Sequence, residues 1–321
     1  MIKAKAALLV KVAMLGLVIC VSSEALSQIR YEAKIDASAK KLWSDAASKI
    51  RCSLKAEIPD YGYVEFQSLS GNHIKTSMSV HPKLGITQNA IMRFVSARPE
   101  WQSGGKERLL GKIKLYESYD PWTGPTLAWK IMNALSQGKQ IYMPYTSSVV
   151  ASDQNIIPAI SPLGFKPHYT NFLNCQEQLL KVSFNDVRLQ PVVFKFQKAE
   201  LTGRSLEALQ TQLAYIKEDK AISNVIIRTF SYDMKDKDEC ITMAKGRADL
   251  LKKYFKDAGF KDDAINVVMF NAMTAQNVAD NVDPDSSPEA RNGIIELIRD
   301  ERSEFRLDDL DLPDVGADSN E

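Results

Sequence analysis

The sequence predicts an α+β protein in which a β-rich N-terminal domain, 28–186, precedes a C-terminal domain, 187–305, with the element order β-α-β-α-β-β. Short β-branched or alternating runs dominate the first region, whereas strand and helix patterns alternate in the second. The 321 residues are enough for about two domains. Hydrophobic residues make up 45% and charged residues 25% of the chain, which excludes a disordered, collagenous or multi-span membrane protein.

The first 27 residues predict a signal peptide, 1–27. Three lysines precede the apolar run 12–21, and a short segment ending in Ala25-Leu26-Ser27 places small residues at the −3 and −1 positions of a cleavage site. The apolar run is about half as long as the roughly 20 residues that span a bilayer. We therefore expect an exported chain that is cleaved after Ser27.

In the N-terminal domain, strand patterns predominate. Four β-branched, aromatic or alternating runs are separated by turn residues and predict strands at 63–66, 74–80, 91–95 and 110–116. Two helices are expected, one at 126–135 that ends at Gly138 and one at 171–180.

In the C-terminal domain, predicted strands alternate with predicted helices. Strands are predicted at 192–196, 225–227, 265–270 and 294–298, and helices at 205–218 and 241–255, with Gly259 just past the end of the second helix. This order predicts a mixed sheet with both helices on one face. The last residues, 306–321, contain no aromatic residue and are expected to be a disordered acidic tail; their acidic residues are Asp308, Asp309, Asp311, Asp314, Asp318 and Glu321.

The composition argues against catalysis, a metal site, a cofactor and nucleic-acid binding. The 41 basic and 40 acidic residues give a net charge of +1, so the chain has no large field for nucleic acid. Its histidines, His73, His81 and His168, are far apart, and no Gly-rich phosphate loop, Gly-x-Ser-x-Gly or His-Glu-x-x-His motif is present. An enzyme that hydrolyses envelope components is a further alternative, but no nucleophile–base pair is visible in the sequence to support it.

Three cysteines remain after cleavage: Cys52, Cys175 and Cys240. An exported chain folds in an oxidising compartment, where two cysteines within reach of each other pair. A Cys52–Cys175 bond would close a loop worth roughly 4 kcal/mol in the chain-entropy model. Three buried thiols are the alternative, which spacing alone does not exclude.

The segment 243–248, Met-Ala-Lys-Gly-Arg-Ala, lies inside the second predicted helix of the C-terminal domain. It resembles the Leu-Ser-x-x-Arg-Ala signature of the OmpA-like peptidoglycan-binding family, whose domains have the same β-α-β-α-β-β order. The resemblance implies that Arg247 and an Asp in a turn hold the carboxylate and ammonium of a diaminopimelate side chain. A guanidinium fork suits a carboxylate, and an Asp suits an ammonium.

The chain departs from this family pattern at two positions. The turn Asp falls on Tyr232, and Asp233 is one residue further on. The closing Asn-Arg-Arg falls on 291–293, so that Gly293 replaces an arginine and Arg291 is the nearest alternative. The expected peptidoglycan-binding residues are therefore Arg247, Asp233 and Arg291. The alternative is that Arg247 is a surface arginine beside a degenerate pocket.

The N-terminal domain also resembles a known family. Its ordered motifs resemble the MotY family of periplasmic T-ring proteins of the flagellar motor; they lie at Trp43, 50–54, 59–62, 99–101, 126–129, 135–139, 172–175 and 179–184. The resemblance implies a Cys52–Cys175 disulfide and a ring-forming structural protein at the basal body and outer membrane. Its implied partners are basal-body ring proteins, stator proteins and peptidoglycan. The alternative is an OmpA-like outer-envelope protein that tethers another complex to the cell wall.

Overall fold

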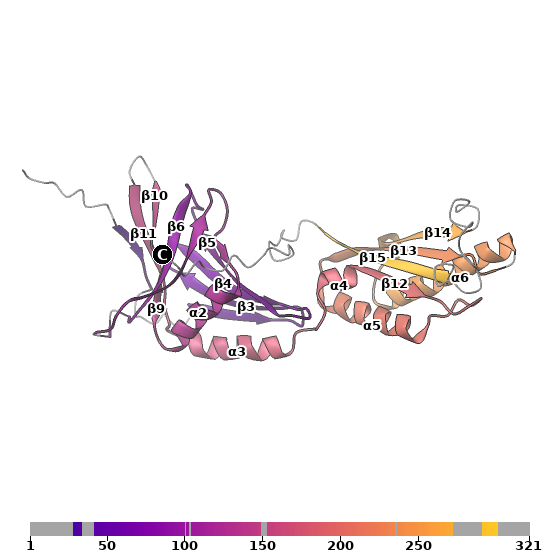
Figure 1. Cartoon of the computed structure of the whole chain (residues 1–321), viewed down its shortest axis with the longest axis horizontal. Coiled ribbons are helices and arrows are strands. Elements are labelled where there is room, and N and C mark those ends of the chain that lie inside the picture. The colour runs from indigo at the N-terminus through magenta and orange to yellow at the C-terminus, as the bar shows by residue number, and fades with distance from the viewer. Residues whose placement is uncertain are drawn as a thin grey trace, which may run out of the picture.

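The computed structural model describes residues 28–33, 42–99, 101–102, 104–148, 153–234, 236–271 and 291–300. The predicted signal peptide and acidic tail lie outside these residues. The described part contains three sheets and several helices, which confirms the predicted α+β class (Figure 1). None of the described helices has the length and apolarity that crossing a membrane requires.

An antiparallel five-stranded sheet lies in the N-terminal part, which we define as residues 28–177. Its strand order is β2-β3-β4-β5-β8, with bounds Trp43–Ala47, Arg51–Ile58, Gly62–Leu69, Lys75–Pro82 and Trp122–Thr123. Buried and more exposed residues alternate along strand β3, because Cys52, Leu54 and Ala56 point into the core while their neighbours stay partly exposed. Gly62 is required between β3 and β4, since a Cβ there would lie 2.0 Å from the His81 carbonyl oxygen.

A second sheet of six strands completes this part. Its order is β1-β11-β9-β6-β7, and β10 also pairs with β11. The bounds are Gln28–Tyr31 for β1, Asp153–Ile160 for β11, Gln140–Tyr142 for β9, Ala90–Ala97 for β6, Arg108–Leu115 for β7 and Tyr145–Ser148 for β10. Strand β1 runs parallel to β11, and the other pairs are antiparallel. Strand β7 forms one edge of the sheet.

Helices α2 (Pro125–Ser136) and α3 (Phe165–Glu177) pack on the two sheets. One buried cluster joins both sheets and both helices; it includes Leu54, Phe66, Met92, Phe94, Ile131, Ile141, Phe165 and Phe172. Pro125 at the first turn suits the start of α2, because a helix needs no N–H there. The helix predicted at 171–180 begins earlier, at Phe165, because Gly164 in the left-handed region marks its start.

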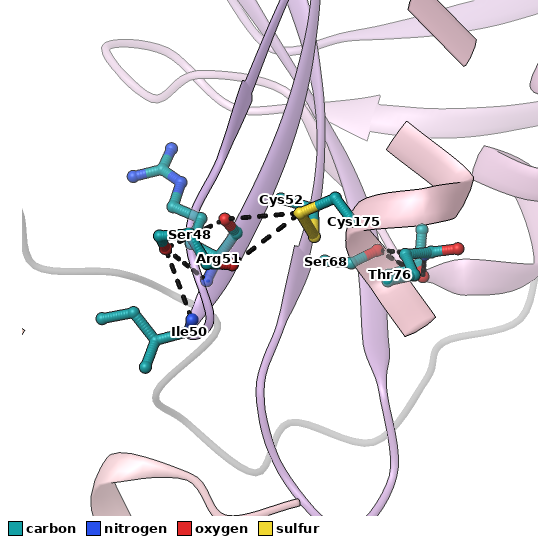
Figure 2. The surroundings of a disulfide bond; sticks show 8 residues. Ser48, Ile50, Arg51, Cys52, Ser68, Thr76 and Cys175 are labelled. Atoms are coloured by element: carbon teal, nitrogen blue, oxygen red, sulfur yellow. Dashed lines mark hydrogen bonds between the residues drawn. A yellow bond between two sulfur atoms is a disulfide. The ribbon is translucent and has the colours of Figure 1, made fainter. Parts of the chain in front are cut away.

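A disulfide joins α3 to β3 (Figure 2). The Cys52 and Cys175 sulfurs are 1.96 Å apart and the two Cα atoms 5.9 Å apart, while Cys240 is free and buried. The Cys175 sulfur also lies 3.8 Å from the Ser48 carbonyl oxygen. The structure therefore contains the bond that the MotY resemblance implied, at the turn between β2 and β3.

The C-terminal part, α4 to β15, has the predicted alternation. The short helix α4 (Phe184–Arg188) leads into β12 (Leu189–Val193), α5 (Gly203–Glu218), β13 (Ile222–Ser231), α6 (Lys237–Asp257), a 3-10 turn η2 (Asp262–Ala264), β14 (Ile265–Asn271) and β15 (Asn292–Arg299). The sheet order is β12-β15-β13-β14. Only β13–β14 is parallel, so the sheet is mixed as expected.

Strand register gives this sheet one buried face. The cross-strand pairs Val225–Leu297, Ile227–Ile295 and Thr229–Gly293 are buried, and the residues between them are less so. Helix α5 packs against β12 and helix α6 against β13 and β14. A second buried cluster fills the space between; it includes Val192, Phe194, Leu209, Val225, Ile227, Leu251, Phe255, Ile295 and Leu297.

The two parts meet at the turn before β3 and the segment after α3. The Leu180 amide donates to the Lys49 carbonyl oxygen over 2.8 Å, and the Gly71 amide donates to the Leu180 carbonyl oxygen over 3.0 Å. Ile50 and Leu180 pack against the C-terminal core, and the Lys49 ammonium lies 3.6 Å from the Glu218 carboxylate. The turn beside the disulfide is therefore also the contact point between the parts.

Candidate functional site

Arg247 lies on α6 and is completely buried, with 0% exposure. Its Nε donates to the Lys198 carbonyl oxygen over 3.2 Å, and one terminal nitrogen donates to the Phe230 carbonyl oxygen over 3.0 Å. The other terminal nitrogen donates to Asp233 over 2.7 Å. Arg247 therefore joins the end of β13, the segment before α5 and its own helix, and it does so without contact with solvent.

Asp233 follows β13 and is 3% exposed. Besides Arg247, it accepts a hydrogen bond of 2.8 Å from the Gln197 amide and one of 3.4 Å from the Ser231 hydroxyl. Burial by itself raises the pKa of Asp233, but the hydrogen bonds from Arg247 and the Gln197 amide outweigh burial and lower this pKa below 3.8. The pair is therefore ionised at neutral pH, which is the state that a buried arginine needs.

Residues 194–201 cover this ion pair. The backbone at Gln197 has a positive φ of 49°, which turns its amide toward Asp233. The Phe194 ring lies 5.1 Å from the Arg247 guanidinium carbon, within cation–π range. An isolated bridge between Phe194 and Leu201 closes the segment. The ion pair consequently fixes the shape of a surface loop.

Arg291 is placed beside this loop and is partly exposed. Its guanidinium carbon is 5.9 Å from the ring of Phe196, which is 39% exposed, and its carbonyl oxygen accepts from the Phe194 amide over 2.9 Å. Among the described residues, the Arg291 Nε has no hydrogen-bond partner. The structure thus brings Arg247 and Asp233 into direct contact, with Arg291 beside the same loop.

The two departures from the OmpA-like pattern have local explanations. Asp233, one residue after Tyr232, supplies the carboxylate to Arg247. Gly293 leaves little room for a side chain, because a Cβ would lie 3.2 Å from both the Arg228 carbonyl oxygen and a Val192 methyl group. An arginine at position 293 would therefore require this part of the sheet to shift.

The sequence analysis treated Arg247 as an accessible side chain, either in a ligand site or on a free surface. The structure places it in neither setting. Helical spacing contains the signal that was missed, because Cys240, Ala244, Arg247 and Leu251 follow one another at intervals of three and four residues and are all buried. An arginine on the apolar stripe of a helix needs a buried partner, which Asp233 provides.

Free Cys240 lies close to the same ion pair. Its sulfur is 3.7 Å from the Met234 carbonyl oxygen. Burial raises the pKa of the Cys240 thiol, and the Asp233 charge adds to the increase, although the contact with Met234 opposes it. The thiol form is therefore favoured, which makes this cysteine a poor nucleophile. No group of three His, Cys, Asp or Glu side chains in the described part of the chain is arranged to hold a metal ion.

The N-terminal part contains a nucleophile–base pair that the sequence analysis missed. The Ser79 hydroxyl oxygen lies 2.8 Å from His81 Nε2, and His81 Nδ1 lies 2.6 Å from an Asp120 carboxylate oxygen. The expectation that no such pair exists was wrong, although the signal is local, because Ser79 and His81 are two residues apart in β5 and so point to the same face. The amide after the serine, that of Val80, donates to the Pro121 carbonyl oxygen over 2.8 Å and is not free to stabilise an oxyanion. The contact therefore ties the segment before β8 to β5.

Comparison with known proteins gives a family model that matches the N-terminal part and a relative that is similar over most of the chain. Residues 31–181 match the family model of the MotY N-terminal domain. The chain is 26% identical over 250 residues to the sodium-type flagellar protein MotY of Vibrio parahaemolyticus, an alignment that covers 78% of this chain and 84% of that protein.

Two solved structures are similar to the chain at low scores. The OmpA-like domain of FopA1 from Francisella tularensis is 18% identical, with a TM-score of 0.28, and the match covers 35% of this chain and 72% of that one. The periplasmic domain of Helicobacter pylori MotB is 14% identical, with a TM-score of 0.26, and the match covers 35% and 70%. TM-scores of this size assign no function to the C-terminal part.

Proposed function

Because the chain is MotY-like, with a MotY N-terminal domain over residues 31–181, we propose that it is a structural component of the flagellar motor. In this role the N-terminal part associates with basal-body ring and stator proteins in the periplasm, within a T ring of several copies. The C-terminal part anchors the assembly to peptidoglycan. The observation that carries the proposal is the match of the N-terminal part to a MotY domain, combined with similarity to MotY that extends over most of the chain.

The proposed division into domains at 28–186 and 187–305 is supported by two separate buried clusters, one formed by residues between 42 and 179 and the other by residues between 187 and 297. The proposed role requires no catalytic residue. The 1–27 segment is proposed to direct export to the periplasm.

For the wall-binding site, we propose that Arg247 and Arg291 have different roles. Arg247 is completely buried and three of its five N–H groups are already bonded within the protein, so a ligand could reach it only if the covering loop 194–201 moved. Arg291 is partly exposed and lies beside the exposed ring of Phe196. We therefore assign the contact with a diaminopimelate carboxylate to Arg291, while Arg247 and Asp233 maintain the loop beside it.

A deletion strain tests the overall role. Loss of swimming with filaments retained is expected for a motor component. Swelling or blebbing of cells that still swim would instead support the alternative, an OmpA-like protein that tethers another envelope complex to the wall.

Association with the motor is tested with a truncated chain that ends at Asp186. If the N-terminal part carries assembly, this chain co-purifies with basal bodies. Failure of a folded truncated chain to associate would contradict the assignment. Tryptophan fluorescence provides the folding control, because all four tryptophans lie between residues 43 and 129.

Sedimentation of the mature chain with purified peptidoglycan tests the wall site. Arg291→Ala is expected to weaken binding at least about tenfold, because truncating one partner of a charged contact typically costs 2–5 kcal/mol. Arg204→Ala is the control, since Arg204 is an exposed arginine at the start of α5, outside the loop 194–201. Wild-type protein that stays in the supernatant would show that this pocket does not bind the wall.

A further inference from the structure

The open edge of the six-stranded sheet is basic. Among the described strands, β7 pairs only with β6, which leaves the outer side of Arg108–Leu115 without a strand partner. The strand carries Arg108, Lys112 and Lys114. Lys112 and Lys114 are two residues apart and so lie on the same face. An exposed edge of this length can accept a further strand through its main-chain groups.

A cavity of about 310 Å³ adjoins this edge, between β7 and the end of α2. Its lining combines apolar and basic residues: Arg108, Leu109, Lys130, Ala134, Gln137 and Lys139. Leu109 is 52% exposed, so its side chain is accessible beside the cavity. The cavity therefore offers an apolar contact next to positive charge.

These positive charges are not neutralised within the described part of the chain. We define the basic edge as Arg93, Arg108, Lys112, Lys114, Lys130 and Lys139; Arg93 faces Lys112 across the β6–β7 ladder. None of the six forms an ion pair within 4.0 Å in that part, although ion pairs occur elsewhere on the surface. A partner with closely spaced carboxylates would match this edge.

The chain itself contains such a partner outside the described residues. The segment 307–321 has six acidic and no basic residues. Within it, Asp309, Leu310, Asp311 and Leu312 alternate acidic and apolar side chains with the period of a β-strand, and Pro313 follows. A segment that is disordered by itself can become ordered when it binds.

The described chain ends close to the N-terminal part. The Arg299 guanidinium carbon lies 3.9 Å from the ring centre of Phe184 and pairs with Asp219, and the Asp300 amide donates to the Ala221 carbonyl oxygen. The neighbouring Glu218 is the residue that contacts Lys49 across the junction. Leu310 is ten residues beyond Asp300 and so lies at most about 35 Å from it. This reach is comparable with the roughly 30 Å given by twice the radius of gyration of a 150-residue domain.

From these observations we propose that residues 307–312 bind the basic edge of the same molecule as an added strand. Asp309 and Asp311 then face Lys112 and Lys114, and a leucine of the segment contacts Leu109 at the cavity. Attachment at residue 300 favours this intramolecular contact, since a short tether raises the effective concentration into the millimolar range. The added strand closes the sheet edge and links the C-terminal part back to the N-terminal part.

Amide hydrogen exchange on the mature full-length chain tests the proposal. The outward-pointing amides of β7 are expected to exchange at least about tenfold faster in Asp309→Lys/Asp311→Lys and in Lys112→Glu/Lys114→Glu than in the wild type. Combining both pairs of substitutions restores opposite charges and should restore protection. Amides of β13 serve as the internal control and should not change. Raising the salt concentration should weaken wild-type protection, because exposed ion pairs are screened.

Two results would overturn the proposal. If β7 exchanges equally in the wild type and in both double variants, the lysines only keep other strands away from the edge. If protection depends on protein concentration and a dimer appears on size-exclusion chromatography, the segment binds a second copy. Melting curves of each variant show whether a loss of protection reflects unfolding.

Discussion

Replacing Arg247 by alanine should destabilise the C-terminal part strongly. Arg247→Ala leaves the Asp233 carboxylate 3% exposed and without its charged partner, and it removes the donors to the Phe230 and Lys198 carbonyl oxygens. Removing one partner of a buried ion pair typically costs 3–5 kcal/mol. Because a domain is stabilised by only about 5–15 kcal/mol in total, the melting temperature of this part should fall by on the order of 10–20 °C.

The tryptophans and the longest helices lie in different parts, so the unfolding of each part can be followed separately. All four tryptophans lie in the N-terminal part, whereas α5 and α6, with 16 and 21 residues, are the longest described helices and belong to the C-terminal part. In urea titrations of Arg247→Ala, the helical circular dichroism should change at a lower urea concentration, and the tryptophan transition should stay where it is in the wild type. Arg204→Ala, the exposed control, should shift neither by more than about 0.5 kcal/mol.

A double-mutant cycle completes this test. Asp233→Asn alone leaves the guanidinium of Arg247 buried and unpaired by charge, so it should also be destabilising. Arg247→Met combined with Asp233→Asn should cost less than the sum of Arg247→Met and Asp233→Asn measured singly, because no buried charge remains. A loss below about 1 kcal/mol in Arg247→Ala would refute the reasoning, since it would mean that water already reaches the site.

Three further predictions concern pH, the disulfide and the sheet. Since the pKa of Asp233 is lower in the folded protein, its stabilising contribution should be present above pH 3.8 and disappear as the pH falls below that value, which acid titration of the circular dichroism checks against Asp233→Asn. Reducing the Cys52–Cys175 bond, which spans 123 residues, should lower the stability of the N-terminal part by roughly 4–5 kcal/mol, measured by tryptophan fluorescence; an unchanged transition would contradict this. Gly293→Ala should destabilise the C-terminal part by about 1–3 kcal/mol in the same urea assay, because its Cβ meets the Arg228 carbonyl oxygen at 3.2 Å; full stability would show that the sheet adjusts freely.

The C-terminal part could be predicted from the sequence in some detail. Each predicted strand and helix there overlaps an observed one, because helical spacing at 205–218 and short β-branched runs are local signals. The strand order β12-β15-β13-β14 was not predicted. It depends on contacts between segments far apart in sequence, such as the pairing of β12 with β15.

The N-terminal part was less predictable. Strands β4, β5, β6 and β7 were expected close to their observed positions, but β1, β2, β3, β8, β9, β10 and β11 were not. Several of these strands are short or only half buried, and β1 is held by parallel pairing with β11, more than a hundred residues away. Their extended conformation depends on their neighbours, since strand preference varies strongly with context.

The candidate site was also only partly predictable from the sequence. The signature around Arg247 and the nearby Asp233 could be found by motif and spacing. Helical spacing could also have indicated that Arg247 is buried, but the contacts of the pair with the Gln197 amide and the Lys198 carbonyl oxygen could not be anticipated, because they come from the segment before α5. The contact of Ser79, His81 and Asp120 was missed for a similar reason, since it depends on how the segment before β8 returns to β5.

The position of the disulfide has a mechanical consequence. Cys175 lies near the end of α3, just before the segment that leads into the C-terminal part, and Cys52 lies in the five-stranded sheet. A pull applied to the C-terminal part therefore passes from the chain after α3 through a covalent bond into β3. Tension along this route does not have to be carried by the hydrogen bonds of α3 or by its packing. The hydrogen bonds between Leu180 and Lys49 and between Gly71 and Leu180 lie further along the same route, so they would be the first contacts to separate.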